Sequence, residues 1–167
     1  MTDVRNILAP TDFSETSDLA LRHAVDAART YGARLYLLHV PGPTGEDFEA
    51  DFPIGDFETT VRKRLATFLS KDEIAALHPE YALRIGVPAE EIVRYAQDRE
   101  IGLIVMGTHG RKGVAHMLLG SVAEHVVRAA PCPVLLVRQQ EQAVAEQRAI
   151  PAREGVGVSK LRSVVIL

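Results

Sequence analysis

The chain has 167 residues, of which 47% are hydrophobic and 25% charged, a composition typical of a globular domain rather than of a disordered chain. Its formal charge of −3 provides no general attraction for nucleic acid or anionic lipid, and no apolar run approaches the roughly 18 residues needed to cross a membrane. The single cysteine, Cys132, excludes an internal disulfide and a cysteine-cluster zinc site. The polar N-terminus is unlike a secretory signal peptide, so we expect one cytoplasmic domain without a nucleic-acid or membrane partner.

Short apolar runs alternate with amphipathic segments along the first part of the chain. Residues 7–9 form an apolar run that predicts a strand. Residues 21–28 place apolar side chains at i, i+3, i+4 and i+7, which predicts a helix that Gly32 ends. Residues 35–40 predict a second buried strand, and the Pro- and Gly-rich residues 41–55 predict a loop.

The same alternation continues to residue 137. The periodicity predicts a helix over 61–69, a half-exposed edge strand over 81–85, a helix over 89–96, a strand over 103–106, a helix over 123–130 and a strand over 134–137. Five strands separated by four helices predict right-handed crossovers and an open parallel sheet with helices on both faces. We expect the strand order 3-2-1-4-5, with a ligand at the carboxyl ends of the strands where the order reverses.

The end of the chain differs in character from the rest. Residues 139–142 are polar, Pro151 interrupts the segment, and residues 163–167 are apolar. This apolar end either pairs with a sheet edge or frays. We therefore divide the chain into a domain over residues 1–138 and a C-terminal extension over residues 139–167.

The segment from Gly107 to Ser121 is the strongest candidate for a binding site. Gly107 follows a predicted buried strand, and Gly120 precedes a predicted helix. Glycines let backbone N–H groups approach an anion, and a helix N-terminus attracts phosphate. Alternatively, Gly107 and Gly110 are turn glycines, and residues 121–124 fit the S-x-x-E pattern of a capping box. The segment is not the G-x-x-x-x-G-K-[ST] loop of nucleotide hydrolases, so their mechanism is not implied.

Other polar residues also allow two interpretations. Asp12 either bonds backbone N–H groups at a helix start, with Glu15 three residues later, or contacts a ligand. Arg111 and Lys112 either neutralise phosphates or form a solvated pair. The six histidines lack the spacing of a zinc site, and Cys132, between two prolines, is expected to be a packing residue rather than a redox thiol.

The spacing Gly107-x2-Gly110-x9-Gly120-Ser121 resembles the nucleotide-binding pattern of the universal stress protein family. Other segments resemble the family's opening strand and turn, the entry of its third helix and its last two strands; these are residues 7–14, 86–92, 103–110 and 131–137. The resemblance covers about residues 3–138. It implies an ATP-binding, often homodimeric stress-response protein with a Rossmann-like fold of the adenine nucleotide alpha hydrolase-like type.

The resemblance also implies a set of site residues. By it, Asp12 contacts ribose or a phosphate-bound metal, and Val40 meets adenine through its backbone. A carboxylate beside a triphosphate is repulsive unless a cation bridges them, so this role of Asp12 implies Mg²⁺. The implied nucleotide-binding residues are Pro10, Thr11, Asp12, Val40, Met106, Gly107, Gly110, Arg111, Gly120, Ser121 and Val122.

The resemblance favours a regulatory binding module that responds to ATP. One alternative is a slow Mg-dependent ATPase or phosphotransferase, in which Asp12 holds Mg²⁺ and Ser121 contacts the terminal phosphate. Another is a binder of AMP or a cyclic nucleotide. No general base is evident near the loop, so no catalytic residue is assigned. Because dimers of the family commonly pair through the last strand, the extension over residues 139–167 bears directly on the expected homodimer.

Overall fold

A computed structural model describes residues 4–41, 57–109, 119–138 and 164–166. The elements are β1 (Asn6–Pro10), α1 (Glu15–Tyr31), β2 (Arg34–His39), α3 (Phe57–Leu65), α4 (Lys71–Ala76), β3 (Glu80–Leu83), α5 (Pro88–Asp98), β4 (Leu103–Gly107), α6 (Ser121–Ala129), β5 (Val134–Val137) and β6 (Val164–Ile166). They confirm the predicted alternation of strands and helices. No helix within these ranges combines the length and the apolar character needed to span a membrane.

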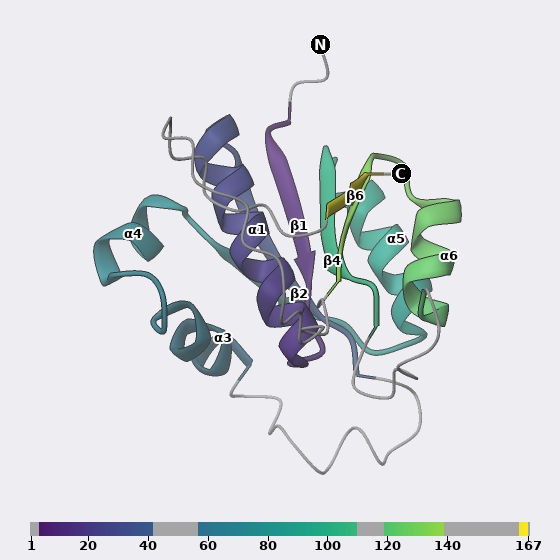
Figure 1. Cartoon of the computed structure of the whole chain (residues 1–167), viewed down its shortest axis with the longest axis horizontal. Helices are drawn as coiled ribbons and strands as arrows, with labels where there is room; N and C mark the ends of the chain where they lie inside the picture. The colour runs from purple at the N-terminus through teal and green to yellow at the C-terminus, as the bar shows by residue number, and fades with distance from the viewer. Residues whose placement is uncertain (1–3, 42–56, 110–118, 139–163, 167) are drawn as a thin grey trace, which may run out of the picture.

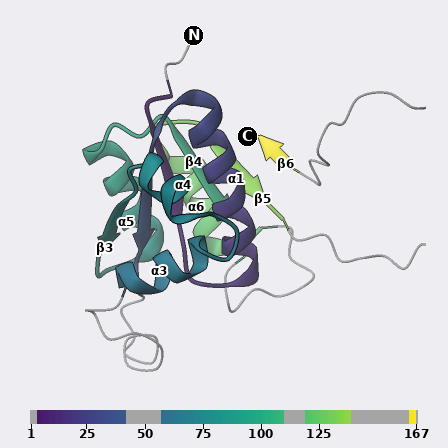
Figure 2. The same ribbon diagram turned by 90° about the vertical axis from the view of Figure 1, so that its left-hand side faces the viewer.

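The strands form one sheet in the order β3-β2-β1-β4-β5-β6. The first five strands are parallel, which confirms the predicted order 3-2-1-4-5. β6 is an addition to the predicted five strands. It pairs antiparallel with β5, with Leu135 opposite Ile166 and Val137 opposite Val164. Of the two outcomes expected for the apolar chain end, the structure therefore shows pairing with the sheet edge (Figure 2).

Helices cover both faces of the sheet (Figure 1). α1, α3 and α4 lie on one face, and α5 and α6 lie on the other. Alternate strand residues supply the two cores, because successive side chains of a strand point to opposite faces. The core under α1 includes Ile7, Leu35, Leu37, Val105 and Val137. The core under α5 and α6 includes Leu8, Tyr36, Leu38, Ile104 and Leu136.

α1 begins and ends as local sequence chemistry requires. The side chain of Ser14 is the N-cap and accepts a hydrogen bond from the N–H of Ser17. Gly32 ends the helix with φ 62°, a left-handed conformation that glycine adopts without a Cβ penalty. The predicted helix stop at Gly32 is confirmed.

The prediction of one helix over residues 61–69 is wrong. α3 ends at Leu65, where the chain tightens into turns with the bonds Thr67 N–H to Arg64 O and Phe68 N–H to Leu65 O. A new helix, α4, then begins at Lys71, with Ser70 as its N-cap. The apolar spacing that suggested one helix persists because Leu65 and Leu69 are buried in the same core across the break.

Candidate functional site

The turn between β1 and α1 is held by the hydroxyl of Thr11. The backbone N–H of Thr11 donates to the carbonyl of Leu38 at 2.8 Å, which ties the end of β1 to β2. The Thr11 hydroxyl lies 3.1 Å from the Ser17 hydroxyl and accepts the N–H of Phe13 at 3.1 Å. Thr11 is buried, so its side chain organises the turn from inside the protein.

Asp12 lies in this turn, at the carboxyl end of β1. Its Oδ1 accepts hydrogen bonds from the backbone N–H of Ser14 at 3.0 Å and from the Ser14 hydroxyl at 2.6 Å. Asp12 thus bonds one backbone N–H group at the start of α1, whose N-cap is Ser14, and these local bonds are compatible with a ligand contact by the same carboxylate. These bonds fix the carboxylate, half-buried, at the edge of the sheet where parallel strands end.

His39 connects the end of β2 to the same turn. Its Nδ1 lies 2.7 Å from the carbonyl oxygen of Thr11, and because a carbonyl only accepts, Nδ1 carries the proton in this bond. The His39 ring also packs against the Phe13 ring, with centroids 4.9 Å apart. Val40 follows directly, half-buried against the core under α5 and α6. His39 is not among the site residues predicted from the sequence. Its position directly before Val40 is the one sequence feature that points to it.

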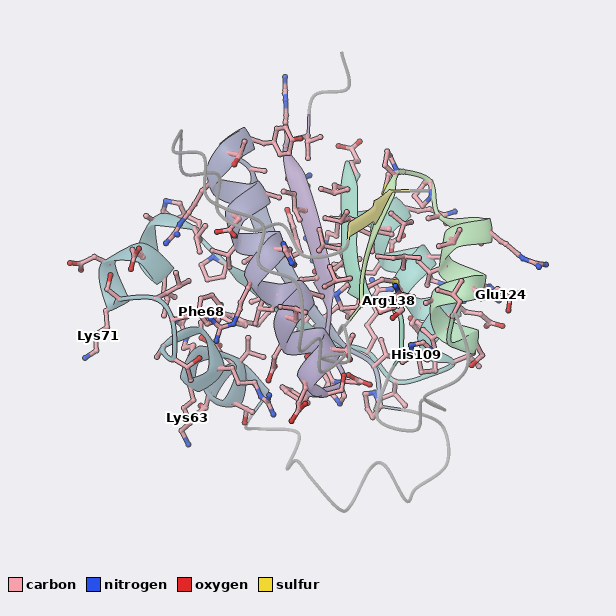
Figure 3. The ribbon with its side chains drawn as sticks, in the orientation of Figure 1. Lys63, Phe68, Lys71, His109, Glu124 and Arg138 are labelled. Carbon is pink, nitrogen blue, oxygen red and sulfur yellow. The ribbon has the colours of Figure 1, made fainter. Side chains whose placement is uncertain are left out.

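The two ends of the glycine-containing loop meet beyond β4. The N–H of Thr108 donates to the carbonyl of Val137 at 2.9 Å, and the N–H of Gly120 donates to the carbonyl of Thr108 at 2.7 Å. Figure 3 shows His109 at this end of the sheet. The predicted site residues Gly110 and Arg111 lie outside the described residues.

Packing within the protein leaves little room for a side chain at Gly107 or Gly120. A Cβ at Gly107 would lie 2.8 Å from Cγ2 of Thr16, in the first turn of α1. A Cβ at Gly120 would lie 3.0 Å from the carbonyl oxygen of Thr108. The close approach at Gly107 brings the start of α1, and with it the turn that carries Asp12, against the end of β4.

The predicted capping box at the start of α6 is wrong. Gly120, not Ser121, occupies the N-cap position, and a glycine has no side chain to form the cap bond. The N–H of Glu124 bonds the carbonyl of Gly120 at 2.9 Å, and the Glu124 carboxylate pairs instead with Arg128 at 2.8 Å. Backbone N–H groups of a first helical turn and the positive end of the helix dipole thus lie at the carboxyl edge of the sheet.

The structure brings all the predicted site residues within the described ranges to this one edge. β1 supplies Pro10, with Thr11 and Asp12 directly after it, and Val40 follows β2. β4 supplies Met106 and Gly107, and the start of α6 supplies Gly120, Ser121 and Val122. The Met106 side chain is buried in the core under α5 and α6, so its backbone is the part that faces the edge.

Cys132 is partly buried and packs against the core under α5 and α6. Burial raises the pKa of the Cys132 thiol to about 11, although a backbone hydrogen bond involving Ile104 lowers it. A thiol with this pKa is protonated at neutral pH, which agrees with a packing role rather than a redox role.

Within the described ranges, no three His, Cys, Asp or Glu side chains gather as a metal site would require.

A cavity of about 670 Å³ lies at the opposite, amino edge of the sheet. Arg5, Arg34 and His78 are among its lining residues, and Arg29, which also lines it, pairs with Glu73 at 2.7 Å. The carboxyl ends of α1 and α4 border this cavity, and the negative ends of their dipoles oppose a bound anion.

Known proteins similar to this chain belong to one family. The sequence model of the Universal stress protein family matches residues 3–138. A universal stress protein of Thermus aquaticus is 38% identical over 143 residues, covering 80% of this chain and 98% of the relative. One of Methanocaldococcus jannaschii is 33% identical over 151 residues, covering 83% and 84%.

Solved structures of universal stress proteins are also similar to this chain. Universal stress protein UspA from Lactobacillus plantarum has a TM-score of 0.60 and 28% identity, covering 81% of this chain and 98% of that chain. A universal stress protein crystallised in complex with cAMP has a TM-score of 0.60 and 26% identity, covering 80% and 96%. The chain belongs to the universal stress protein family.

Proposed function

We propose that this chain binds ATP at the carboxyl edge of its sheet and acts as a nucleotide-dependent regulatory module. The observation that carries the proposal is the start of α6, where the N-cap is a glycine with no side chain to bond the first-turn N–H groups and Gly120 is tied to Thr108 at the end of β4. The turn with Asp12 lies at the same edge of the sheet, because Thr16 in the first turn of α1 closely approaches Gly107 at the end of β4. We further propose that the chain acts in the cytoplasm as a homodimer, as the family resemblance implies.

The helix dipole alone is too weak to hold a nucleotide. It contributes about 0.3–1 kcal/mol at an exposed site, whereas micromolar affinity requires about 8 kcal/mol. Several backbone N–H groups, contacts to adenine from the Val40 backbone and a cation held between Asp12 and the phosphates must therefore act together. One carboxylate together with substrate phosphates is a donor set that Mg²⁺ commonly uses, so Asp12 fits that role.

A second candidate ligand is a monophosphate such as AMP or a cyclic nucleotide. It is favoured by the relative crystallised in complex with cAMP. The two candidates differ in charge. The triphosphate of ATP needs Mg²⁺ to lie near the Asp12 carboxylate, whereas a monophosphate carries less negative charge and depends less on the cation. Competition between ATP and cAMP, each with and without Mg²⁺, separates them.

A pair of substitutions at Ser121 tests the proposal. Ser121 is exposed at the first position of α6. In S121E, the new carboxylate suits the helix dipole but repels phosphate. In S121Q, the side chain has a similar shape and no charge. We expect S121E to keep its melting temperature and lose at least about tenfold in ATP affinity, while S121Q stays close to the wild type.

Isothermal titration calorimetry of ATP with Mg²⁺ measures these affinities. Equal affinity in S121E and S121Q would show that phosphate does not lie at the start of α6. The proposal would then fail even if ATP bound elsewhere on the protein.

A further inference from the structure

One arginine of α3 reaches the turn that carries Asp12. The Arg64 guanidinium donates a hydrogen bond to Oδ2 of Asp18, in the first turn of α1. The same guanidinium lies 5.0 Å from the centroid of the Phe13 ring. Its side chain is only 32% exposed, so this contact is partly shielded from water. α3 lies beside α1 on one face of the sheet (Figure 1).

Phe13 needs such external support because of its backbone conformation. Its φ is 63°, a left-handed value that costs a non-glycine residue roughly 1–2 kcal/mol. The ring is 6% exposed and packs against His39, while the Thr11 hydroxyl accepts the backbone N–H. Since Asp12 directly precedes Phe13, the conformation of Phe13 determines the direction in which the Asp12 backbone and side chain leave the turn.

Asp18 makes Arg64 difficult to remove alone. Burial raises the pKa of the Asp18 carboxyl, while the nearby Arg64 lowers it. Oδ1 of Asp18 is buried without a hydrogen-bond partner in the described part of the chain. The Asp18 side chain is 37% exposed and Arg22 also acts on it, but loss of Arg64 alone would still leave a partly buried carboxylate without its ion-pair partner, which is destabilising by itself.

We propose that Arg64 is a positioning residue for the nucleotide: through it, α3 holds Phe13 in place and so determines where Asp12 meets the cation and phosphates. This inference rests on the proposed function. Coupling between sites is reciprocal, so a nucleotide that requires Asp12 in this position also favours the docked position of α3. A partner that binds only when α3 is displaced would lower the affinity for the nucleotide, and the nucleotide would lower the affinity for that partner by the same factor.

The chain offers a closely matched control on the same helix. Arg62 also pairs with a carboxylate, at 2.8 Å from Glu58, and also lies over an aromatic ring, 4.9 Å from the Tyr81 centroid. The ring that Arg62 contacts belongs to Tyr81 of β3, whereas the ring that Arg64 contacts belongs to Phe13 in the turn with Asp12. The double variant R64M/D18N removes one arginine–carboxylate pair without leaving a lone charge, and R62M/E58Q does the same at the control position.

The test is the ATP affinity of the full chain, measured by calorimetry with Mg²⁺ and again with EDTA. We expect R64M/D18N to lose about tenfold in affinity with Mg²⁺ and to change little in EDTA, because Asp12 acts through the cation. R62M/E58Q should match the wild type in both conditions. R64K keeps the charge beside Asp18 but loses the planar group over Phe13, and should lie between the wild type and R64M/D18N.

Three results would overturn the inference. R64M/D18N, or R64K if the double variant does not fold, could bind Mg-ATP as tightly as the wild type. It could lose affinity equally with Mg²⁺ and in EDTA, as a general loss of structure would cause. The control R62M/E58Q could show the same Mg-dependent loss. Failure of the proposed function is seen separately, as absence of ATP binding by the wild type.

Discussion

At the scale of single residues, Phe13 shows how the site depends on an unfavourable backbone conformation. This buried aromatic residue has φ 63°; among the residues that the structure describes, His78 and Glu100 are the other non-glycine residues with positive φ. Neither composition nor periodicity indicates this conformation, because the polar turn after Pro10 is compatible with several turn types. The contacts with Thr11 and His39 that hold it come from elsewhere in the fold.

This conformation predicts an unusual order of stabilities. F13G and F13A both remove the ring, but only alanine retains a Cβ that opposes φ 63°. We expect F13G to be more stable than F13A by about 1 kcal/mol, although glycine ordinarily destabilises relative to alanine. Urea unfolding measures the difference.

Phe68 provides the control position. It lies in the turn after α3, where Arg22 stacks over its ring at 4.4 Å, and its φ is not positive. There F68A should be more stable than F68G. If alanine were the more stable substitution at both positions, Phe13 would not be strained.

At the scale of elements, one sequence motif gives two different helix starts. Residues 70–73 and residues 121–124 both read S-x-x-E. At the start of α4, Ser70 and Glu73 form the reciprocal bonds of a capping box. At the start of α6, the bond from Gly120 to Thr108 places Gly120 at the N-cap, so Ser121 is already inside the helix.

The same contrast explains which parts of the fold the sequence predicts. Strands and long helices follow from local periodicity, so α1, α5 and the five parallel strands were predictable. The strand order does not follow from periodicity, and the expectation of it agrees with the family that the sequence resembles. The break after Leu65 and the cap at Gly120 depend on turns and contacts between distant residues. The edge that gathers the site residues was predictable from topology, whereas the packing of Thr16 against Gly107 and the bond from His39 to Thr11 were not.

At the scale of the whole molecule, β6 covers the outer edge of β5. A homodimer that pairs through its last strand, as the family resemblance implies, needs this edge free. The pairing of β6 shows that the edge accepts an antiparallel strand, and two copies of β5 related by a two-fold axis would also meet antiparallel. In the proposed homodimer, the C-terminal strand would therefore compete with a second copy of the chain for one edge.

Deletion of residues 164–167 should shift the chain toward the dimer. It removes β6 and exposes the backbone groups of β5, whereas deletion of Leu167 alone leaves β6 in place. Light scattering at several protein concentrations gives the mass of each species. No increase in dimer after the longer deletion would mean that β6 does not control association.

In the proposed function, backbone amides at the carboxyl edge of the sheet hold the phosphates of an adenine nucleotide. Amide chemical shifts, recorded as Mg-ATP is added to isotope-labelled protein, test this contact residue by residue. We expect the largest changes at Asp12, Gly107, Ser121 and Val122. Changes concentrated instead around the amino-edge cavity, at Arg5, Arg34 and His78, or no saturable change at all, would contradict this expectation.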